Sequence, residues 1–123
     1  VPGMAERGLG RVVNVASTTF WLNAPEMTAY IASKGGVIGF SRALAAEVGA
    51  SGVTVNVIAP GLTNTKTMKG ENEEIFDYLP KQQAIPRLIE PTDLVGVVSF
   101  LCSADSAFVT GQTIVADGGQ VRN

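Results

Sequence analysis

Tyr30 and Lys34 are four residues apart in a segment whose apolar residues recur at helical spacing, so both side chains should project from one face of a helix. Ser17 follows a short β-branched segment, where a strand is expected to end. A phenol can exchange a proton with a substrate oxygen, and a serine hydroxyl can hydrogen-bond the same oxygen. The three side chains therefore indicate acid–base chemistry at an alcohol or carbonyl oxygen.

A free phenol has a pKa of about 10, which is too high for a base near neutrality. A neighbouring ammonium group favours the phenolate, typically by about 1–3 pKa units. A Tyr-x-x-x-Lys pair alone is a weak signal, because such pairs are more often surface side chains that lie along a helix. Here the pair is accompanied by Ser17 at one strand end and by Pro60-Gly61 at the next. Ligands of open parallel sheets bind beyond these carboxyl ends, so one shared crevice is expected.

The chain has no histidine and a single cysteine, Cys102. These counts exclude a disulfide within the chain, a zinc site built on Cys/His clusters, and a nucleophile activated by a histidine of this chain. We therefore expect no metal. Catalysis must use Ser, Thr, Tyr, Lys, Asp, Glu or backbone groups.

The composition is that of an ordinary globular domain: 123 residues, 46% of them hydrophobic, with a net charge of -2. No basic stripe suggests a nucleic-acid partner, and no apolar stretch approaches the roughly 20 residues that span a bilayer. The first residues lack the zones of a signal peptide. The expectation is a cytoplasmic protein that acts on a small molecule.

Strands alternate with helices along the chain. The expected strands are residues 11–16, 53–58 and 112–116, the expected helices are residues 26–48, 73–79 and 91–101, and a loop is expected around residues 20–25. The order β-α-β-α-α-β, with strands apolar on both faces, predicts an α/β fold with a doubly wound parallel sheet. Three strands would leave an edge exposed, so we expect a piece of a longer protein.

Several motifs occur in an order that resembles the short-chain dehydrogenase/reductase family. They are Asn14-Val15-Ala16-Ser17, Tyr30-Ile31-Ala32-Ser33-Lys34, Asn56-Val57-Ile58-Ala59-Pro60-Gly61, Thr110-Gly111-Gln112 and Asp117-Gly118-Gly119. The resemblance covers essentially the whole chain and implies the C-terminal, catalytic half (1–123) of a Rossmann-like domain, without its N-terminal cofactor-binding half. It also implies that a hydride is transferred between a nicotinamide cofactor and a secondary alcohol or ketone. The cofactor would be NAD or NADP, with NAD slightly preferred.

The resemblance assigns a role to each candidate residue. Ser17 would polarise the substrate oxygen, Tyr30 would be the acid/base, and Lys34 would stabilise the phenolate and bind the nicotinamide ribose. The loop Pro60-Gly61-Leu62-Thr63-Asn64-Thr65 would hold the carboxamide, through the backbone of Thr63 and the hydroxyl of Thr65. The phosphate-binding glycine loop and the residue that selects NAD or NADP do not occur here, so the isolated chain is expected to be inactive.

Apolar and aromatic residues flank the expected crevice, and Trp21 and Met68 are assigned with Ser17 to the substrate pocket. The runs 17–22 and 83–88 are similar to those of 1-phenylethanol-type dehydrogenases, which favours an apolar or aromatic substrate. A 3-oxoacyl-(acyl-carrier-protein) reductase is the main alternative, although the acidic residues after Lys69 count against an acidic carrier. In the enoyl-reductase branch the Tyr-to-Lys spacing is longer, and in halohydrin dehalogenases an arginine takes the place of the lysine, so Tyr30 and Lys34 fit neither.

Two further expectations concern the whole protein. Family resemblance implies a homo-oligomer, commonly a tetramer. A binding or scaffold protein that has lost turnover is the alternative of another class, and the presence of Ser17, Tyr30 and Lys34 counts against it.

Other positions have structural interpretations. Asn14 and Asn56 are expected to bond strand-end backbone, with Asn14 a possible cofactor neighbour, and Arg87 is expected to form an ion pair. Gly35 and Gly36 would each weaken a helix by roughly 1 kcal/mol relative to alanine, which suggests close packing against a neighbouring helix. Cys102 is expected to be a small core residue.

Overall fold

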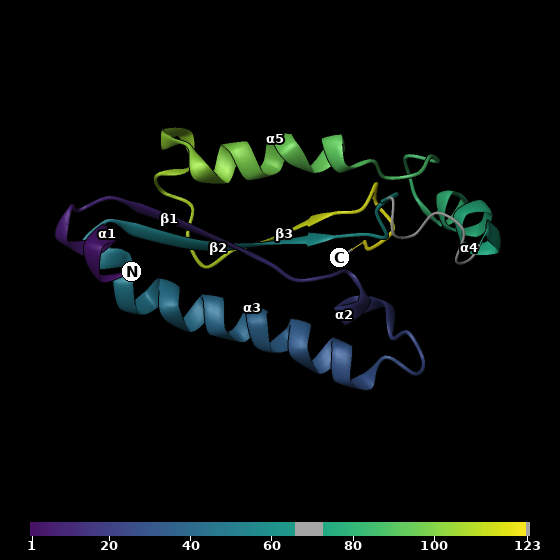
Figure 1. The fold of residues 1–123 in the computed structure, drawn as a ribbon, viewed down its shortest axis with the longest axis horizontal. Coiled ribbons are helices and arrows are strands. Elements are labelled where there is room, and N and C mark those ends of the chain that lie inside the picture. The colour runs from purple at the N-terminus through teal and green to yellow at the C-terminus, as the bar shows by residue number, and fades with distance from the viewer. Residues whose placement is uncertain (66–72, 123) are drawn as a thin grey trace.

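Three parallel strands form a single sheet in the order β1-β2-β3. The computed structural model describes residues 1–65 and 73–122, with β1 at Gly10–Val15, β2 at Val53–Pro60 and β3 at Thr113–Ala116. Helix α3 (Thr28–Val48) covers one face of the sheet and helix α5 (Pro91–Cys102) covers the other (Figure 1). The predicted α/β fold with a doubly wound parallel sheet is confirmed.

The central strand β2 is buried on both faces, as parallel strands between two helical layers usually are. Its polar residue Asn56 is 1% exposed, and both polar atoms of its side chain bond the backbone. Asn56 Nδ2 donates to the carbonyl oxygen of Val109 at 2.7 Å, and Asn56 Oδ1 accepts from the backbone N–H of Gln112 at 3.1 Å. The structural role predicted for Asn56 is confirmed, and it ties the approach to β3 against β2.

Strands that are apolar on both faces are expected to be buried, and for the first strand this expectation is wrong in part. Strand β1 pairs only with β2 among the described strands, and most of its side chains are half-buried, with Val15 54% exposed. A β-branched run predicts a strand, but burial depends on which neighbours lie beside it. Asn14 donates from Nδ2 to Ser41 Oγ at 2.8 Å, so it joins β1 to α3 instead of bonding strand-end backbone.

The structure contains two short helices that the sequence analysis did not predict. Helix α1 (Pro2–Glu6) precedes β1, and α2 (Thr19–Leu22) lies where a loop was expected. The packing of α2 against α3 explains one of the two adjacent glycines. A Cβ at Gly35 would lie 2.9 Å from Phe20 Cε2, whereas a Cβ at Gly36 would meet none of the described atoms within 4 Å. Close packing is therefore confirmed for Gly35 and not found for Gly36.

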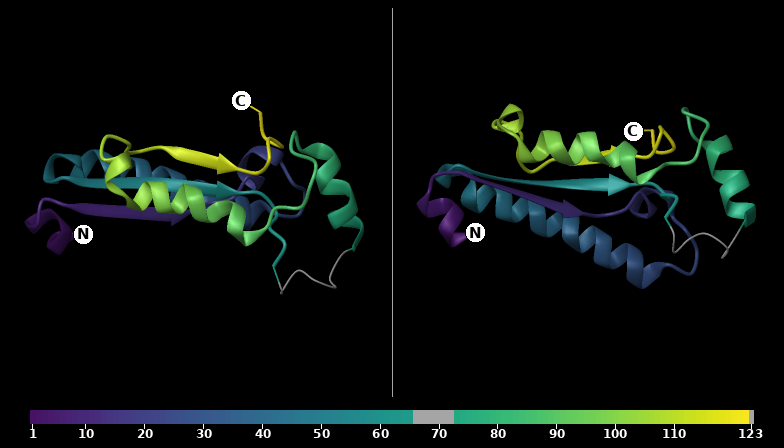
Figure 2. Two further views of the ribbon diagram at one scale, coloured as in Figure 1. Left: turned by 90° about the horizontal axis from the view of Figure 1, so that it is seen from above. Right: turned by 45° about the horizontal axis from the view of Figure 1, so that its top comes forward.

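The segment between β2 and β3 contains α4 (Glu73–Tyr78), a 3-10 turn (Leu79–Gln82) and α5, and further 3-10 turns lie at Gly49–Ser51 and Ala104–Ser106. Helix α4 lies beyond the carboxyl ends of the strands (Figure 2). The prediction for Cys102 is wrong, because its side chain is exposed at the end of α5. Across residues 1–65 and 73–122, no helix has the length and apolar character that crossing a bilayer requires.

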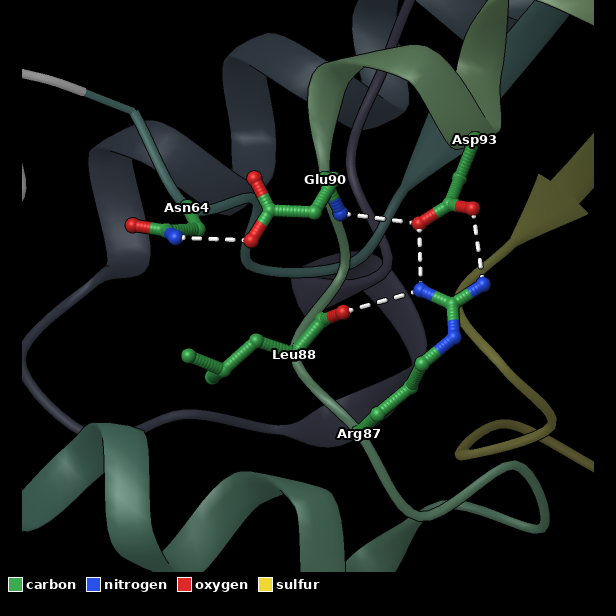
Figure 3. Close-up of polar contacts among 5 residues, drawn as sticks. All are labelled: Asn64, Arg87, Leu88, Glu90 and Asp93. Atoms are coloured by element: carbon green, nitrogen blue, oxygen red, sulfur yellow. Dashed lines mark hydrogen bonds and ion pairs between the residues drawn. The ribbon is translucent and has the colours of Figure 1, made fainter.

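The loop that precedes α5 is held by charged and polar contacts (Figure 3). Arg87 and Asp93 form a two-point ion pair, with both N–O distances 2.7 Å, so the predicted ion-pair role of Arg87 is confirmed. Asp93 Oδ2 also accepts the backbone N–H of Glu90 at 2.8 Å, and Asn64 Nδ2 donates to Glu90 Oε1 at 2.8 Å. The start of α5 is thereby tied to the loop that follows β2.

Candidate active site

A cavity of about 590 Å³ lies at the carboxyl ends of β1 and β2. Its lining comes from the end of β1, from α2 and α3, from the loop after β2, from α4 and the turn after it, and from the segment after β3. Six of the residues predicted as site residues are among its walls: Ser17, Tyr30, Lys34, Pro60, Gly61 and Thr63.

Ser17 is placed by the end of the sheet. The backbone N–H of Ala16 donates to Ile58 at 2.8 Å and that of Thr18 to Pro60 at 3.1 Å, so the chain beyond β1 continues along β2 and fixes Ser17 between the two bonds. Ser17 is 9% exposed, and its Oγ accepts from the hydroxyl of Thr19 at 3.0 Å and from its backbone N–H at 3.3 Å. With these two bonds accepted, the hydroxyl hydrogen of Ser17 is available to a ligand.

Thr19 was not predicted as a functional residue. Its signal is visible in the run Ser17-Thr18-Thr19, because a hydroxyl two residues after another is well placed for a local turn bond. The sequence alone does not say which of the two threonines reaches Ser17. The structure assigns this contact to Thr19, since Thr18 Oγ1 instead donates to the carbonyl oxygen of Pro60 at 3.3 Å.

Tyr30 and Lys34 lie on successive turns near the start of α3 and face the same cavity. Lys34 Nζ donates to the carbonyl oxygen of Val15 at 3.2 Å and lies 5.5 Å from the centroid of the Tyr30 ring. The last residue of β1 therefore holds the ammonium group beside the ring. Tyr30 is 41% exposed, so its hydroxyl is not enclosed by the described part of the chain.

The loop after β2 is fixed by packing and by backbone bonds. A Cβ at Gly61 would lie 2.7 Å from Ile89 Cδ1 and 2.9 Å from Asp117 Cβ, so only glycine fits without a shift. Thr63 Oγ1 donates to the carbonyl oxygen of Gly61 at 3.1 Å, and the N–H of Asn64 donates to Ile89 at 2.7 Å. Thr63 lines the cavity, whereas Thr65 is exposed and is not among the lining residues.

Of the residues predicted for the substrate pocket, Ser17 lines the cavity and Trp21 does not. Trp21 packs against the buried core cluster of Ala16, Ile38, Val57 and Ala59, edge-on to Phe20, and does not line the cavity. Met68 lies outside the described residues. The apolar walls are formed instead by Val15, Ala16, Leu22, Ala24, Met27, Pro60, Leu62, Ile75 and Leu79. An indole next to a strand-end serine can turn toward the core or toward a ligand, and the sequence does not distinguish the two.

A second cavity, of about 270 Å³, lies between α5 and β3 and includes the Arg87–Asp93 pair in its wall. The hydrogen bonds from Arg87 and then from the Glu90 backbone lower the pKa of Asp93 to about 2. The same pairing raises the pKa of Arg87. Both groups are therefore fully charged near neutrality, which suits a structural pair and not a proton-transfer site.

Known proteins match this chain along nearly its whole length. A protein-family model described as enoyl-(acyl carrier protein) reductase, which is one of the models of short-chain dehydrogenases/reductases, matches residues 1–120. The chain belongs to the short-chain dehydrogenase/reductase family. The description of that model names one branch of the family, whereas the Tyr30-to-Lys34 spacing differs from the longer spacing expected of enoyl reductases.

Individual short-chain dehydrogenases/reductases match almost all of the chain. The (2S)-((R)-hydroxy(phenyl)methyl)succinyl-CoA dehydrogenase subunit of Thauera aromatica is 42% identical over 95% of this chain and 47% of its own length. A 3-oxoacyl-(acyl-carrier protein) reductase of Brucella melitensis with bound NAD is 36% identical, with a TM-score of 0.86 over 96% of this chain and 43% of that one. A gluconate 5-dehydrogenase of Burkholderia cenocepacia in complex with NADP and tartrate is 32% identical, with a TM-score of 0.90 over 97% and 48%.

The chain spans about half the length of the curated relatives that it matches. The family and the partial Rossmann-like fold are thus shown, and both agree with the resemblance of the motifs. The named substrates differ among the three relatives described, so they do not select one for this chain.

Proposed function

We propose that this chain forms the catalytic half of an oxidoreductase that transfers a hydride between a nicotinamide cofactor and a secondary alcohol or ketone with apolar or aromatic substituents. One observation carries the proposal: Ser17, Tyr30 and Lys34 line one cavity at the carboxyl ends of parallel strands. The largely apolar walls of this cavity favour a substrate with few charged groups.

In the direction of ketone reduction, Tyr30 donates its hydroxyl proton to the carbonyl oxygen, and Ser17 hydrogen-bonds that oxygen as negative charge develops on it. The hydride is supplied by the reduced nicotinamide when it is bound. The phenolate left on Tyr30 is stabilised by the ammonium group of Lys34, which β1 holds near the ring. In alcohol oxidation the same residues act in reverse, with Tyr30 taking the proton.

The donor set of the cavity fits a nicotinamide riboside. Lys34 gives one N–H to Val15 and has further N–H groups for ribose hydroxyls. The hydroxyl of Thr63 is engaged with Gly61, so Thr63 would meet the carboxamide through its backbone, and Thr65 would contribute its hydroxyl. We propose NAD as the first cofactor to test and NADP as the second.

The partial coverage of the relatives supports an activity that belongs to a longer protein, in which an N-terminal half supplies the phosphate-binding part of the cofactor site. We also propose that this whole protein is a homo-oligomer, with a tetramer as the expected form. Light scattering on the purified protein measures that mass directly.

The decisive experiment replaces Tyr30 in the whole protein. Tyr30→Phe removes one oxygen and should lower kcat by roughly 10²–10⁴-fold, the usual range for a lost acid–base group. The melting temperature should stay close to that of the wild type, because Tyr30 is 41% exposed.

Tyr78→Phe is the matched control, since Tyr78 is the other tyrosine of the chain, is 58% exposed and does not line the cavity. Equal kcat values for the two variants would contradict the assignment of Tyr30. If Tyr30→Phe kept the full biological function of the protein, the scaffold alternative would replace the enzyme.

A 3-oxoacyl-(acyl-carrier-protein) reductase remains the second candidate, because a reductase with that name shares the fold over 96% of this chain. The comparison to make is kcat/KM for an aryl ketone such as acetophenone against kcat/KM for an acetoacetyl thioester. The proposed function predicts the higher value for acetophenone. A higher value for the thioester would favour the reductase of carrier-bound substrates.

A further inference from the structure

In the cavity at the carboxyl ends of β1 and β2, most polar side chains already have a hydrogen-bond partner or a proposed role. Each of the three lining threonines donates its hydroxyl hydrogen to a neighbour: Thr18 to Pro60, Thr19 to Ser17, and Thr63 to Gly61. Ser17, Tyr30 and Lys34 are assigned to the reacting oxygen and the cofactor under the proposed function. The remaining polar side chain among the described lining residues is Gln120.

A turn stabilised by side-chain hydrogen bonds holds Gln120 in place. The carboxylate of Asp117, which is 3% exposed, accepts three backbone N–H groups, from Gly119 at 2.9 Å, from Gln120 at 3.2 Å and from Val121 at 2.8 Å. Gly118 and Gly119 have φ values of 67° and 79°, which side chains rarely adopt. The turn thus fixes the backbone of Gln120 at the cavity wall.

Neighbouring segments leave this turn little freedom. A Cβ at Gly119 would lie 2.9 Å from Ala84 Cβ, and one at Gly118 would lie 2.9 Å from Gln83 Oε1. The N–H of Ile85 donates to the carbonyl oxygen of Gly118 at 2.8 Å. The chain therefore places a carboxamide at one position of an otherwise largely apolar wall. Among the described residues, no bond to this carboxamide is formed within the chain.

We infer that Gln120 is a specificity-determining residue that hydrogen-bonds a second, neutral carbonyl of the substrate, apart from the carbonyl that is reduced. The class is an apolar or aromatic ketone that carries a second, neutral carbonyl, such as that of an ester, a few atoms away. A carboxamide both donates and accepts, and it carries no charge, so it suits a neutral partner in an apolar wall. Asp117 acts as a positioning residue through the turn. This inference rests on the proposed function.

The test uses the whole protein and two ketones of equal chain length, ethyl acetoacetate and 2-heptanone. They differ in the ester group that Gln120 would bind. For each variant the quantity compared is the ratio of kcat/KM for the ester to kcat/KM for the plain ketone. Gln120→Met keeps the side-chain length and should lower this ratio roughly tenfold, mainly through a higher KM for the ester.

Two further variants separate recognition from stability. Gln112→Met makes the same change before β3, at an exposed residue away from the cavity, and should leave the ratio at its wild-type value. Asp117→Asn cannot accept all three backbone bonds, so it should lower the ratio as well as the melting temperature. A purely structural role for Asp117 would lower the melting temperature and leave the ratio unchanged.

The outcomes distinguish the two proposals. If the wild-type protein reduces both ketones and Gln120→Met changes the ratio by less than about twofold, the inference about Gln120 is overturned and the proposed function stands. If the wild type reduces acetophenone but neither of these two ketones with NADH or NADPH, the inference is overturned and the proposed function stands. If it reduces none of the three ketones, both fail. A selective loss for the ester supports both.

Discussion

Ser17 accepts two hydrogen bonds from Thr19, and these bonds determine which way its own hydrogen can point. Removing the hydroxyl donor with Thr19→Val leaves the backbone N–H bond in place but lets the Ser17 hydroxyl rotate. We expect kcat/KM to fall by roughly three- to tenfold, the effect of one neutral hydrogen bond. Steady-state kinetics of the whole protein measure this change.

Thr28→Val is the matched control for that variant, because Thr28 is exposed at the start of α3 and does not line the cavity. The melting temperatures of both variants should remain near the wild-type value. An unchanged kcat/KM for Thr19→Val would mean that Ser17 is oriented by its ligand and not by its neighbour.

The site residues that local patterns predict are those whose placement is local. A spacing of four on a helix puts Tyr30 and Lys34 on one face wherever the helix packs, and a serine that follows a parallel strand lies at the ligand-binding end of the sheet. Trp21 and Gln120 depend on how distant segments pack. Trp21 turns to the core, and Gln120 reaches the cavity only because β3 ends beside the loop after β2.

At the scale of elements, the start of α5 depends on one carboxylate. Asp93 accepts from Arg87 and from the Glu90 backbone, and these hydrogen bonds lower its pKa to about 2. A carboxylate with a depressed pKa in the folded state stabilises the fold above its unfolded pKa. This contribution is fully present above about pH 4 and is lost as the pH falls from about 4 to about 2.

Asp93→Asn should therefore lower the melting temperature at pH 7, and the difference from the wild type should shrink below pH 4. Thermal unfolding followed by circular dichroism at pH 7, 4 and 3 tests this dependence. Asp105→Asn, at an exposed aspartate of the 3-10 turn after α5, provides the comparison. A difference between wild type and Asp93→Asn that stays constant down to pH 3 would contradict the role of the ion pair.

The elements missed by the sequence prediction are the shortest ones. Helix α2 has four residues and α1 has five, which is too few for an apolar repeat to be visible. Pro2 at the first position of α1 was the available signal. The strands and the two long helices were predicted because their patterns extend over enough residues. The burial expected of β1 was wrong in part, since burial depends on the neighbouring segments.

At the scale of the whole molecule, the proposed catalytic side chains lie at the carboxyl ends of a three-stranded sheet, and the chain covers about half of each of the relatives described. The isolated chain should consequently bind NAD or NADP far more weakly than the whole protein. Isothermal titration calorimetry with both polypeptides tests this expectation. Normal cofactor affinity and turnover by the isolated 123-residue chain would contradict the division into two halves.

The exposed thiol at the end of α5 has a practical consequence. Cys102 is the only cysteine in this chain, and α5 runs from the carboxyl ends of the strands to the opposite end of the sheet (Figure 2). A maleimide dye would therefore attach to this chain at a single, known position, remote from the proposed chemistry. Fluorescence from that position can report cofactor binding or subunit assembly as energy transfer or anisotropy, without a label in the cavity itself.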